Sequence, residues 1–412
     1  MTAIDKSPTV VEDRRGNRID KTQTYVRYEP IPAQRLKGVA SHMDLTSSTA
    51  LDMEQLFPVR HVLNPDGSLA GAEPSFLTPE QLKEVYRHMV YLRAFDQRCL
   101  NLQRQGRMGT FAPFSGQEAC QVGSAYLLRK GQDWVFPTYR DHGAMQVLGV
   151  PSVNILRYYM GDEMGSHAPQ GVNAFPISIP IATQLVHAVG AAWAAKIKGE
   201  DTVTVGYAGD GGTSPGDFHE AMNFAAVYNT GSILFIQNNK YAISTPNAKQ
   251  FKTRTLAQRA LAYDIPGVRV DGQDILAVLT VMHEAIERAR SGGGPTLVEA
   301  LTFRYGPHTT SDDPKRYRTE EEVSEWQAKD PIERMRKYLV AKGLWSDADD
   351  EALWGWARDQ VAAAVSEAEA MPKPSVDDLF NYLYEEPTPE LIRQREYLKS
   401  YLAKKGEGKA HG

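Results

Sequence analysis

The chain is poor in cysteine, in long apolar runs and in excess charge. Its 412 residues include two cysteines, Cys99 and Cys120, which is too few for a disulfide framework or a zinc site, so we expect both to be buried. No window approaches the roughly 18 apolar residues of a membrane span. The polar stretch from Met1 to Asp20 predicts no secretory signal, and a net charge of −5 gives no reason to expect nucleic-acid binding. These absences favour a cytoplasmic globular enzyme.

Two common phosphate-binding motifs are also missing. No Gly-x-Gly-x-x-Gly segment opens a helix after a strand, as a nicotinamide-dinucleotide fold requires. There is no Gly-Lys-Ser/Thr loop of the Walker type either. A simple nucleotide-binding module, which would need such a fingerprint, is therefore disfavoured.

Strand and helix patterns alternate between about residues 130 and 310. Short apolar runs at 202–207, 233–237, 267–270 and 296–303 are typical of strands. Residues 274–290 predict a helix capped by Asp274, and the small-residue-rich segment Ile181–Lys198 is nearly apolar throughout, which predicts a buried helix. The alternation indicates an α/β fold, in which a mostly parallel sheet is covered by helices on both faces.

The two ends of the chain differ from this central region. Residues 1–75 contain scattered prolines and turn formers and predict an extended arm. The first helix begins after Thr78, with Pro79 at its first position and Gln81 completing a capping box. Capping signatures at Thr319 and Asp330 predict a helical C-terminal region. We therefore divide the chain into an arm (1–75), an α/β domain (76–318) and a helical region (319–412).

The most informative segment covers residues 209–241. It reads Gly-Asp-Gly-Gly at 209–212 and, about one helix and one strand later, Asn-Asn-Lys-Tyr at 238–241. A carboxylate, an amide oxygen and a backbone carbonyl suit a hard cation whose shell is completed by phosphate oxygens. Glycines let the backbone approach the phosphates, and ligands of such sheets bind at the carboxyl ends of strands, where Asp210 and Asn239 fall. The segment predicts a diphosphate held by magnesium.

This pairing of Gly-Asp-Gly with a downstream Asn-Asn resembles the cofactor motif of the thiamine diphosphate enzymes. The resemblance implies that Asp210, Asn239 and the Tyr241 carbonyl bind magnesium, while Gly211 and Gly212 lie against the diphosphate.

A second segment, at 136–141, resembles the Tyr-Arg pair of the 2-oxo acid dehydrogenases that reaches the diphosphate. The residues at that position are Tyr139 and Arg140. A guanidinium fork can hold two phosphate oxygens at once. The commoner role of a single arginine is a surface ion pair.

The segment Ser178–Gln184 resembles the family segment that closes around the cofactor and, in some members, holds potassium. The implied potassium ligands are Ser178, the Pro180 carbonyl, Thr183 and Gln184, and Ile181 would be an apolar wedge under the bent cofactor. The alternative is an ordinary helix N-terminus at which Thr183 makes a local hydrogen bond.

The segment 304–314 follows a strand and has no helical pattern, so it predicts a loop at the rim of the sheet. His308 is suited to proton transfer because histidine titrates near neutral pH. The resemblance implies that His308 faces the cofactor and that Arg304 orders the loop or faces a phosphate. Mammalian relatives carry a phosphorylated serine directly after this histidine, whereas Thr309 stands there in this chain.

Five further segments narrow the resemblance. Residues 102–107 and 116–119 are similar to the family's entry region and imply proximity to the substrate. Residues 373–402, with 239–245 and 311–313, are more similar to the alpha subunit of branched-chain 2-oxo acid dehydrogenase than to that of pyruvate dehydrogenase. This implies oxidative decarboxylation of acids of the 3-methyl-2-oxobutanoate type, the reaction of 3-methyl-2-oxobutanoate dehydrogenase (2-methylpropanoyl-transferring).

Two alternatives stay open. A pyruvate or acetoin dehydrogenase alpha subunit would share every site residue named above. A non-catalytic assembly subunit would predict a broken magnesium triad, whereas Asp210, Asn239 and Tyr241 are intact.

The length of the chain points to a partner. A self-sufficient enzyme of this type needs two α/β domains, and this chain has room for about one. The resemblance implies a beta subunit that carries the activating glutamate, with the cofactor at the interface of an alpha-two beta-two heterotetramer. It also implies acyl transfer to a lipoyl-bearing acyltransferase core, with His308 assisting proton transfer.

Overall fold

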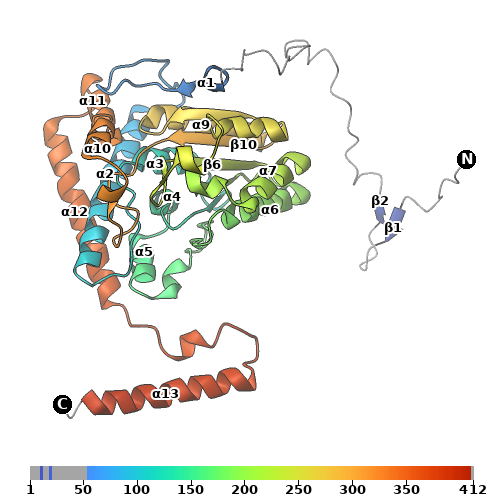
Figure 1. Ribbon diagram of the computed structural model, residues 1–412, viewed down its shortest axis with the longest axis vertical. Helices are drawn as coiled ribbons and strands as arrows, with labels where there is room; N and C mark the ends of the chain where they lie inside the picture. Colours follow the sequence, from blue (N-terminus) through green and yellow to red (C-terminus); the bar gives the residue numbers. More distant parts are fainter. Residues whose placement is uncertain (1–9, 13–17, 21–52, 410–412) are drawn as a thin grey trace, which may run out of the picture. The chain divides into compact units, whose positions relative to one another are not determined.

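The computed structural model describes residues 10–12, 18–20 and 53–409, and it divides into two units, 1–51 and 52–412. In the first unit, β1 (Val10–Glu12) pairs antiparallel with β2 (Arg18–Asp20). Most of the predicted arm lies outside the described residues. The second unit carries the main sheet and the helices (Figure 1).

The main sheet has six strands in the order β3-β9-β10-β6-β5-β4, and all neighbouring strands are parallel. The predicted α/β class is therefore confirmed, and so are the four predicted strands. Two further strands, β3 and β4, are too short for an apolar run to reveal them. The strands are β3 (Val59–Arg60), β4 (Trp134–Phe136), β5 (Thr204–Gly209), β6 (Ser232–Asn238), β9 (Gly267–Asp271) and β10 (Thr296–Leu301).

The segment that contains β3 belongs to the sheet and not to an extended arm. Val62 and Leu63, which follow β3, are buried, and both of their backbone N–H groups donate to Asp274 Oδ2 over 2.6 Å. The boundary predicted at residue 75 is thus too late, because turn formers near residues 64–74 concealed a short edge strand.

Helices cover both faces of the sheet (Figure 1). Successive residues of β6 pack into opposite cores: Leu234 and Ile236 contact the core under α6 and α7, whereas Ile233 and Phe235 contact the core under α2, α3 and α9. This alternation is the signature of a strand buried on both faces. The covering helices are α2 (Pro79–Arg104), α3 (Glu118–Ala125), α6 (Thr183–Lys198), α7 (Gly216–Tyr228) and α9 (Ile275–Arg290).

The remaining helices connect or extend these layers. They are α1 (Met53–Leu56), α4 (His142–Leu148), α5 (Ser152–Tyr159), α8 (Asn247–Gln250), α10 (Glu320–Gln327), α11 (Pro331–Ala341), α12 (Asp347–Ala370) and α13 (Pro389–Lys409). The predicted helical C-terminal region is thus present from α10 onward. A short hairpin, β7 (Tyr241–Ala242) and β8 (Thr245–Pro246), follows β6.

The predicted helix caps are confirmed. The Thr78 hydroxyl accepts from the Gln81 N–H while the Gln81 side chain accepts from the Thr78 N–H. Asp274, Thr319 and Asp330 likewise accept backbone N–H groups at the starts of α9, α10 and α11. Local hydrogen bonding therefore sets these boundaries, as the sequence indicated.

Helix α6 differs from its prediction. Its Leu185 and Val189 side chains are buried against the sheet, but Val186 and Ile197 are 41% and 71% exposed. The segment was expected to be buried all round, and in this chain only one of its faces is covered.

Both cysteines are buried, as expected. Among the described residues, no helix is long and apolar enough to cross a membrane.

Asp274 links β3, α9 and α11, and its loss should be costly. Besides accepting from the N–H groups of Val62 and Leu63, which follow β3, its carboxylate caps α9 and lies 3.7 Å from Arg334 Nη2. We expect Asp274→Ala to destabilise the protein by about 3–5 kcal/mol, because buried N–H groups lose their acceptor and the buried Arg334 guanidinium loses one of its two carboxylate partners. Thr78→Ala, which removes only one cap, should cost about 1 kcal/mol. Thermal denaturation of both variants would test this, and equal melting temperatures would contradict it.

Candidate cofactor site

A cavity of about 320 Å³ opens at the carboxyl ends of β5 and β6. The structure brings together around it every residue predicted to contact the cofactor. These are Tyr139, Arg140, Ser178, Ile181, Asp210, Gly211, Gly212, Asn239, Tyr241, Arg304 and His308. Because they come from segments up to 170 positions apart in the chain, the tertiary fold creates their proximity.

The pairing of β5 with β6 positions the acidic and amide groups. Gly209 at the end of β5 lies opposite Gln237 of β6. Asp210 and Asn239 follow in the next turns, and the Asn239 N–H donates to Asp210 Oδ1 over 3.3 Å. The other carboxylate oxygen of Asp210 accepts from Gln250 Nε2 over 2.8 Å. The Asp210 carboxylate is therefore held at the floor of the cavity.

Three polar groups converge at this point. One end of the Asn239 side-chain amide lies 3.0 Å from the Tyr241 carbonyl oxygen and 3.3 Å from Asp210 Oδ1. With its NH₂ group turned inward the amide donates to both oxygens, and with its oxygen turned inward it would instead contribute a third oxygen to a bound cation. A single carboxylate with two neutral oxygens is a donor set that suits magnesium. The three predicted ligands thus fit a hard cation.

Burial gives the Asp210 carboxyl an unusual proton affinity. Loss of hydration raises its pKa to about 6, although the Gln250 amide and nearby backbone N–H groups oppose the rise. A cation would remove this cost by neutralising the carboxylate.

The two glycines of the motif line the same floor where side chains cannot fit. A Cβ atom at Gly211 would lie 2.6 Å from Ala242 Cβ, and one at Gly212 would lie 2.9 Å from Ala208 Cβ. The backbone here is thus directly accessible to a ligand.

Two buried arginines make the cavity positive. Arg140 donates to the carbonyls of Pro113 and His308, and Arg304 donates to the Ile243 carbonyl. Neither forms an ion pair with a carboxylate among the described residues. Burial, followed by repulsion from Arg304, lowers the pKa of Arg140 to about 10, so it remains charged at neutral pH. Buried charges without partners favour an anionic ligand.

His308 lies half-buried beside these arginines. Arg140 Nη2 is 3.1 Å from His308 Nδ1, and the Tyr139 ring meets the imidazole edge-on at 5.9 Å. Because a guanidinium can only donate, Nδ1 is the acceptor and the proton of the neutral ring is on Nε2. The His308 N–H donates to Asp312 Oδ2 over 2.7 Å, which holds the loop in place. Burial, together with Arg140 and Arg304, lowers the pKa of His308 to about 3.

The predicted potassium ligands make separate contacts. The Ser178 hydroxyl donates to the Pro180 carbonyl over 3.0 Å, whereas Thr183 Oγ1 donates to Asp217 Oδ2 over 2.9 Å. Gln184 donates to the Tyr207 carbonyl, and its own side-chain oxygen is buried without a partner among the residues that the structure describes. That free oxygen is compatible with a cation ligand, and the potassium site stays a prediction.

The sequence did not single out several polar residues of the cavity. Gln117 is fully buried and lines the cavity, and within the described part of the chain its Nε2 group has no hydrogen-bond partner. Asp141 accepts from Thr138 and from Gln237, which places three more polar side chains along the wall. Gln237 belongs to no recognisable motif, whereas Gln117 lies in the predicted entry segment 116–119, and Thr138 and Asp141 lie in the segment 136–141. Residues 102–107, the other segment predicted to lie near the substrate entry, do not line the cavity.

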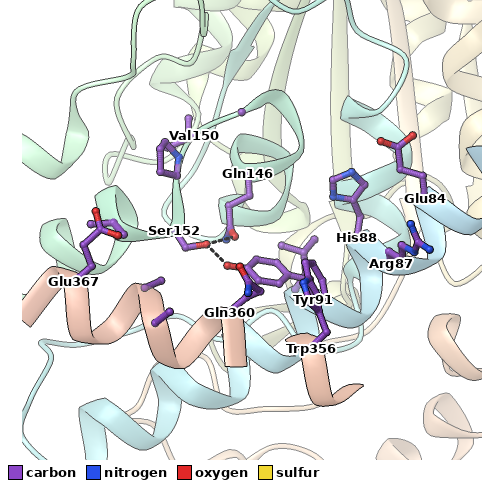
Figure 2. A pocket seen from close by; sticks show the side chains of 16 residues that line it. Glu84, Arg87, His88, Tyr91, Gln146, Val150, Ser152, Trp356, Gln360 and Glu367 are labelled. Carbon is purple, nitrogen blue, oxygen red and sulfur yellow. Dashed lines mark hydrogen bonds between the residues drawn. The ribbon is translucent and has the colours of Figure 1, made fainter. Parts of the chain in front are cut away.

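A second, wider groove of about 660 Å³ lies between α2, α12 and the start of α5 (Figure 2). Tyr91, Ser152 and Gln146 form a hydrogen-bonded chain within it. This groove is lined by side chains of helices and of the turn before α5, and no strand end reaches it. None of the predicted site residues is among its lining residues. The chemistry predicted from the sequence therefore belongs to the cavity at β5 and β6.

A parallel α/β sheet with a positively charged cavity at the carboxyl ends of its strands is typical of a cofactor-binding protein. The chain belongs to the dehydrogenase E1 component family, whose model matches residues 86–377 and whose members depend on thiamine diphosphate. It is 46% identical over 361 residues to the 3-methyl-2-oxobutanoate dehydrogenase subunit alpha of Mycobacterium tuberculosis. It is 43% identical over 356 residues to the pyruvate dehydrogenase E1 component subunit alpha of Staphylococcus epidermidis. Each alignment covers 86% of this chain and 96% of the relative, so the chain is a 2-oxo acid dehydrogenase E1 alpha subunit.

The environment of His308 predicts its titration. With a pKa of about 3, the ring should stay neutral between pH 8 and 5 in the ligand-free protein. Because the unfolded chain takes up a proton near pH 6.5, this residue should lower stability as the pH falls from 6.5 towards 3. Arg140→Leu should raise the pKa of His308, whereas Arg107→Leu, which removes a surface ion pair with Glu369, should not. NMR of ¹³C-labelled histidine would measure this, and titration near pH 6.5 without any substitution would contradict it.

Proposed function

We propose that this chain holds the magnesium and diphosphate of thiamine diphosphate and, with a beta subunit, decarboxylates branched-chain 2-oxo acids. The observation that carries the proposal is the convergence of the Asp210 carboxylate, the Asn239 amide and the Tyr241 carbonyl beside Arg140 and Arg304. One cation would bind the oxygens of the first three groups, and one polyanion would bind the two guanidiniums, which form no ion pair within the described part of the chain. Thiamine diphosphate combines a diphosphate with a ring that accepts the electron pair left by decarboxylation.

The residues of the cavity have distinct proposed roles. Asp210, Asn239 and the Tyr241 carbonyl would bind magnesium, and Arg140 would contact a terminal phosphate. Ile181, next to Gly212, would support the bent cofactor.

His308 is the proposed proton-transfer residue. Its neutral ring carries its proton on Nε2, since Nδ1 accepts from Arg140. It can therefore donate a hydrogen bond to a substrate or acceptor oxygen without first being ionised.

We propose a branched-chain substrate because residues 373–402, 239–245 and 311–313 are similar to that alpha subunit. The proposed assembly is an alpha-two beta-two heterotetramer that passes its acyl group to a lipoyl-bearing acyltransferase core. A pyruvate-specific enzyme is the second candidate, because this chain is also 43–44% identical to pyruvate dehydrogenase E1 alpha subunits.

Removing the proposed metal carboxylate should abolish cofactor binding. We expect Asp210→Ala, assembled with its beta subunit, to lose magnesium-dependent thiamine diphosphate binding by at least about 100-fold, because the only carboxylate ligand is gone. Asp201→Ala, which removes a surface partner of Arg129, should bind normally. Calorimetric titration would measure both affinities, and normal binding by Asp210→Ala would refute the ligand assignment. Weaker binding when sodium replaces potassium would support the potassium site.

Substrate preference can be measured directly. The chain with its co-expressed beta subunit, thiamine diphosphate and magnesium should decarboxylate 3-methyl-2-oxobutanoate and 4-methyl-2-oxopentanoate faster than pyruvate. One methylene in an apolar pocket is worth about 1–3 kcal/mol, so the expected preference is roughly 10–200-fold. The chain alone should be inactive. Fastest turnover of pyruvate would contradict the proposed branched-chain substrate. No turnover of any of these acids would favour a non-catalytic subunit.

A further inference from the structure

A buried carboxylate lies behind the cofactor cavity. Glu299, in the middle of β10, is 1% exposed, although its neighbours Leu297, Val298 and Ala300 are apolar and pack into the cores on both faces of the sheet. An ionised side chain in such a place is costly unless polar groups surround it. Glu299 does not line the cavity at the ends of β5 and β6, so the roles proposed above do not account for it.

Several donors fix the Glu299 carboxylate in one orientation. Its Oε1 accepts from Asn238 Nδ2 over 2.7 Å, and its Oε2 accepts from the backbone N–H groups of Leu256 and Ala257, each over 2.9 Å. Arg269, its partner on the neighbouring strand β9, brings Nε to 3.6 Å from Oε2. Both carboxylate oxygens are therefore occupied.

Asn238 transmits this orientation to the turn that follows β6. Because a carboxylate only accepts, Asn238 must present its NH₂ group to Glu299 and its oxygen to the opposite side. That oxygen accepts from the Lys240 N–H over 3.2 Å. Lys240 has a φ of 73°, a left-handed conformation that is unfavourable for a residue with a Cβ atom. The hydrogen bond from its N–H to the Asn238 side chain is of the kind that stabilises such a turn.

The turn at Lys240 orients two of the three proposed metal ligands. Asn239 precedes Lys240 and Tyr241 follows it, so the backbone angles of Lys240 set the direction of the Tyr241 carbonyl relative to the Asn239 side chain. One end of the Asn239 amide lies 3.0 Å from the Tyr241 carbonyl oxygen. A turn that relaxed to a negative φ would move the two groups apart.

We propose that Glu299 is a positioning residue of the metal site, an inference that rests on the proposed function. Acting through Asn238, it holds the turn at Lys240 in the geometry that presents both neighbouring residues to a cation. Outer partners of metal ligands typically contribute about 10–100-fold to metal affinity. In the alternative, a purely structural role, Glu299 would only join β10 to a neighbouring loop, and its loss would lower stability without changing metal affinity.

Exchanging the acid and the amide tests the hydrogen-bond link. In Glu299→Gln a single acceptor oxygen remains, so an NH₂ group must face either Asn238 or the backbone donors. In Asn238→Asp two carboxylates face each other at pH 8 and repel. The double variant restores a donor opposite an acceptor: the new glutamine donates to the new aspartate, whose other oxygen accepts from the Lys240 N–H.

The measurement is the affinity for Mn²⁺, which prefers oxygen ligands as Mg²⁺ does, in the complex of this chain with its beta subunit and saturating thiamine diphosphate. Electron paramagnetic resonance at pH 8 would count the free metal. We expect each single substitution to weaken Mn²⁺ binding by about 10–100-fold, and the double variant to recover most of the loss. An effect of charge alone has the opposite sign for Asn238→Asp, because a negative charge beside the proposed ligands would tighten binding.

Asp133→Asn is the matched control. Like Glu299, Asp133 is fully buried, and its carboxylate accepts from the backbone N–H groups of Arg129 and Val203. It also forms an ion pair with Arg290 over 2.7 Å. Because it precedes β4, it lies at the opposite end of the parallel strands from the cavity. Its substitution should lower the melting temperature as Glu299→Gln does, but it should leave Mn²⁺ affinity unchanged.

Unchanged Mn²⁺ affinity in both single variants, or an equal loss in Asp133→Asn, would overturn the inference. Tighter binding by Asn238→Asp, or a double variant no better than the single ones, would overturn it too. Where one single variant does not assemble, the other single variant and the double variant decide. A wild-type complex that binds neither thiamine diphosphate nor Mn²⁺ would refute the proposed function, and the inference with it. Normal wild-type binding with full affinity in Glu299→Gln would refute the positioning role alone.

Discussion

The parallel pairing of β5 with β6 is the constraint on which the site depends. With Gly209 opposite Gln237, the turns after the two strands bring Asp210 next to Asn239. A shift of one residue in this register would exchange the two faces of β6 and bury the wrong side chains. The apolar side chains that β6 inserts into both cores therefore also determine the distance between the proposed metal ligands.

The cavity separates groups that suit a cation from groups that suit an anion. The Asp210 carboxylate, the Asn239 amide and the Tyr241 carbonyl converge at one end, and two guanidiniums, without carboxylate partners among the residues that the structure describes, lie at the other. The surrounding structure tolerates this because backbone carbonyls accept from the arginines, and because Arg318 fixes the rim by donating to the carbonyls of residues 304–306. Such preorganisation raises affinity for a ligand that supplies the opposite charges, since the protein needs little rearrangement to bind it.

The same reasoning connects the cavity to the outer surface of α6. One side of this helix packs on β5 and carries the cavity lip at its start, while its other side remains apolar and exposed. A helix that is apolar all round is normally buried. Its sequence is thus consistent with an assembled protein in which both sides are covered, and only one of those sides is supplied by this chain.

The resemblance to the thiamine diphosphate enzymes indicated the predicted cavity residues, whereas local signals in the sequence predicted the parallel sheet and the helix caps at Thr78, Asp274, Thr319 and Asp330. These features depend on hydrogen bonds within one turn or on the periodicity of one segment, so neighbouring residues suffice to specify them. Strands β3 and β4 were missed because two or three residues carry too little pattern.

Only the tertiary structure decided which long-range contacts form. It placed Gln117 beside Asn239 and Gln250 beside Asp210, set the tautomer of His308 through Arg140, and exposed one side of α6. The sequence by itself determined the types of ligand atoms and the elements that carry them. Their spacing, burial and proton affinity depend on packing between distant segments, because a pKa or an unpaired charge is a property of the surroundings and not of the residue alone.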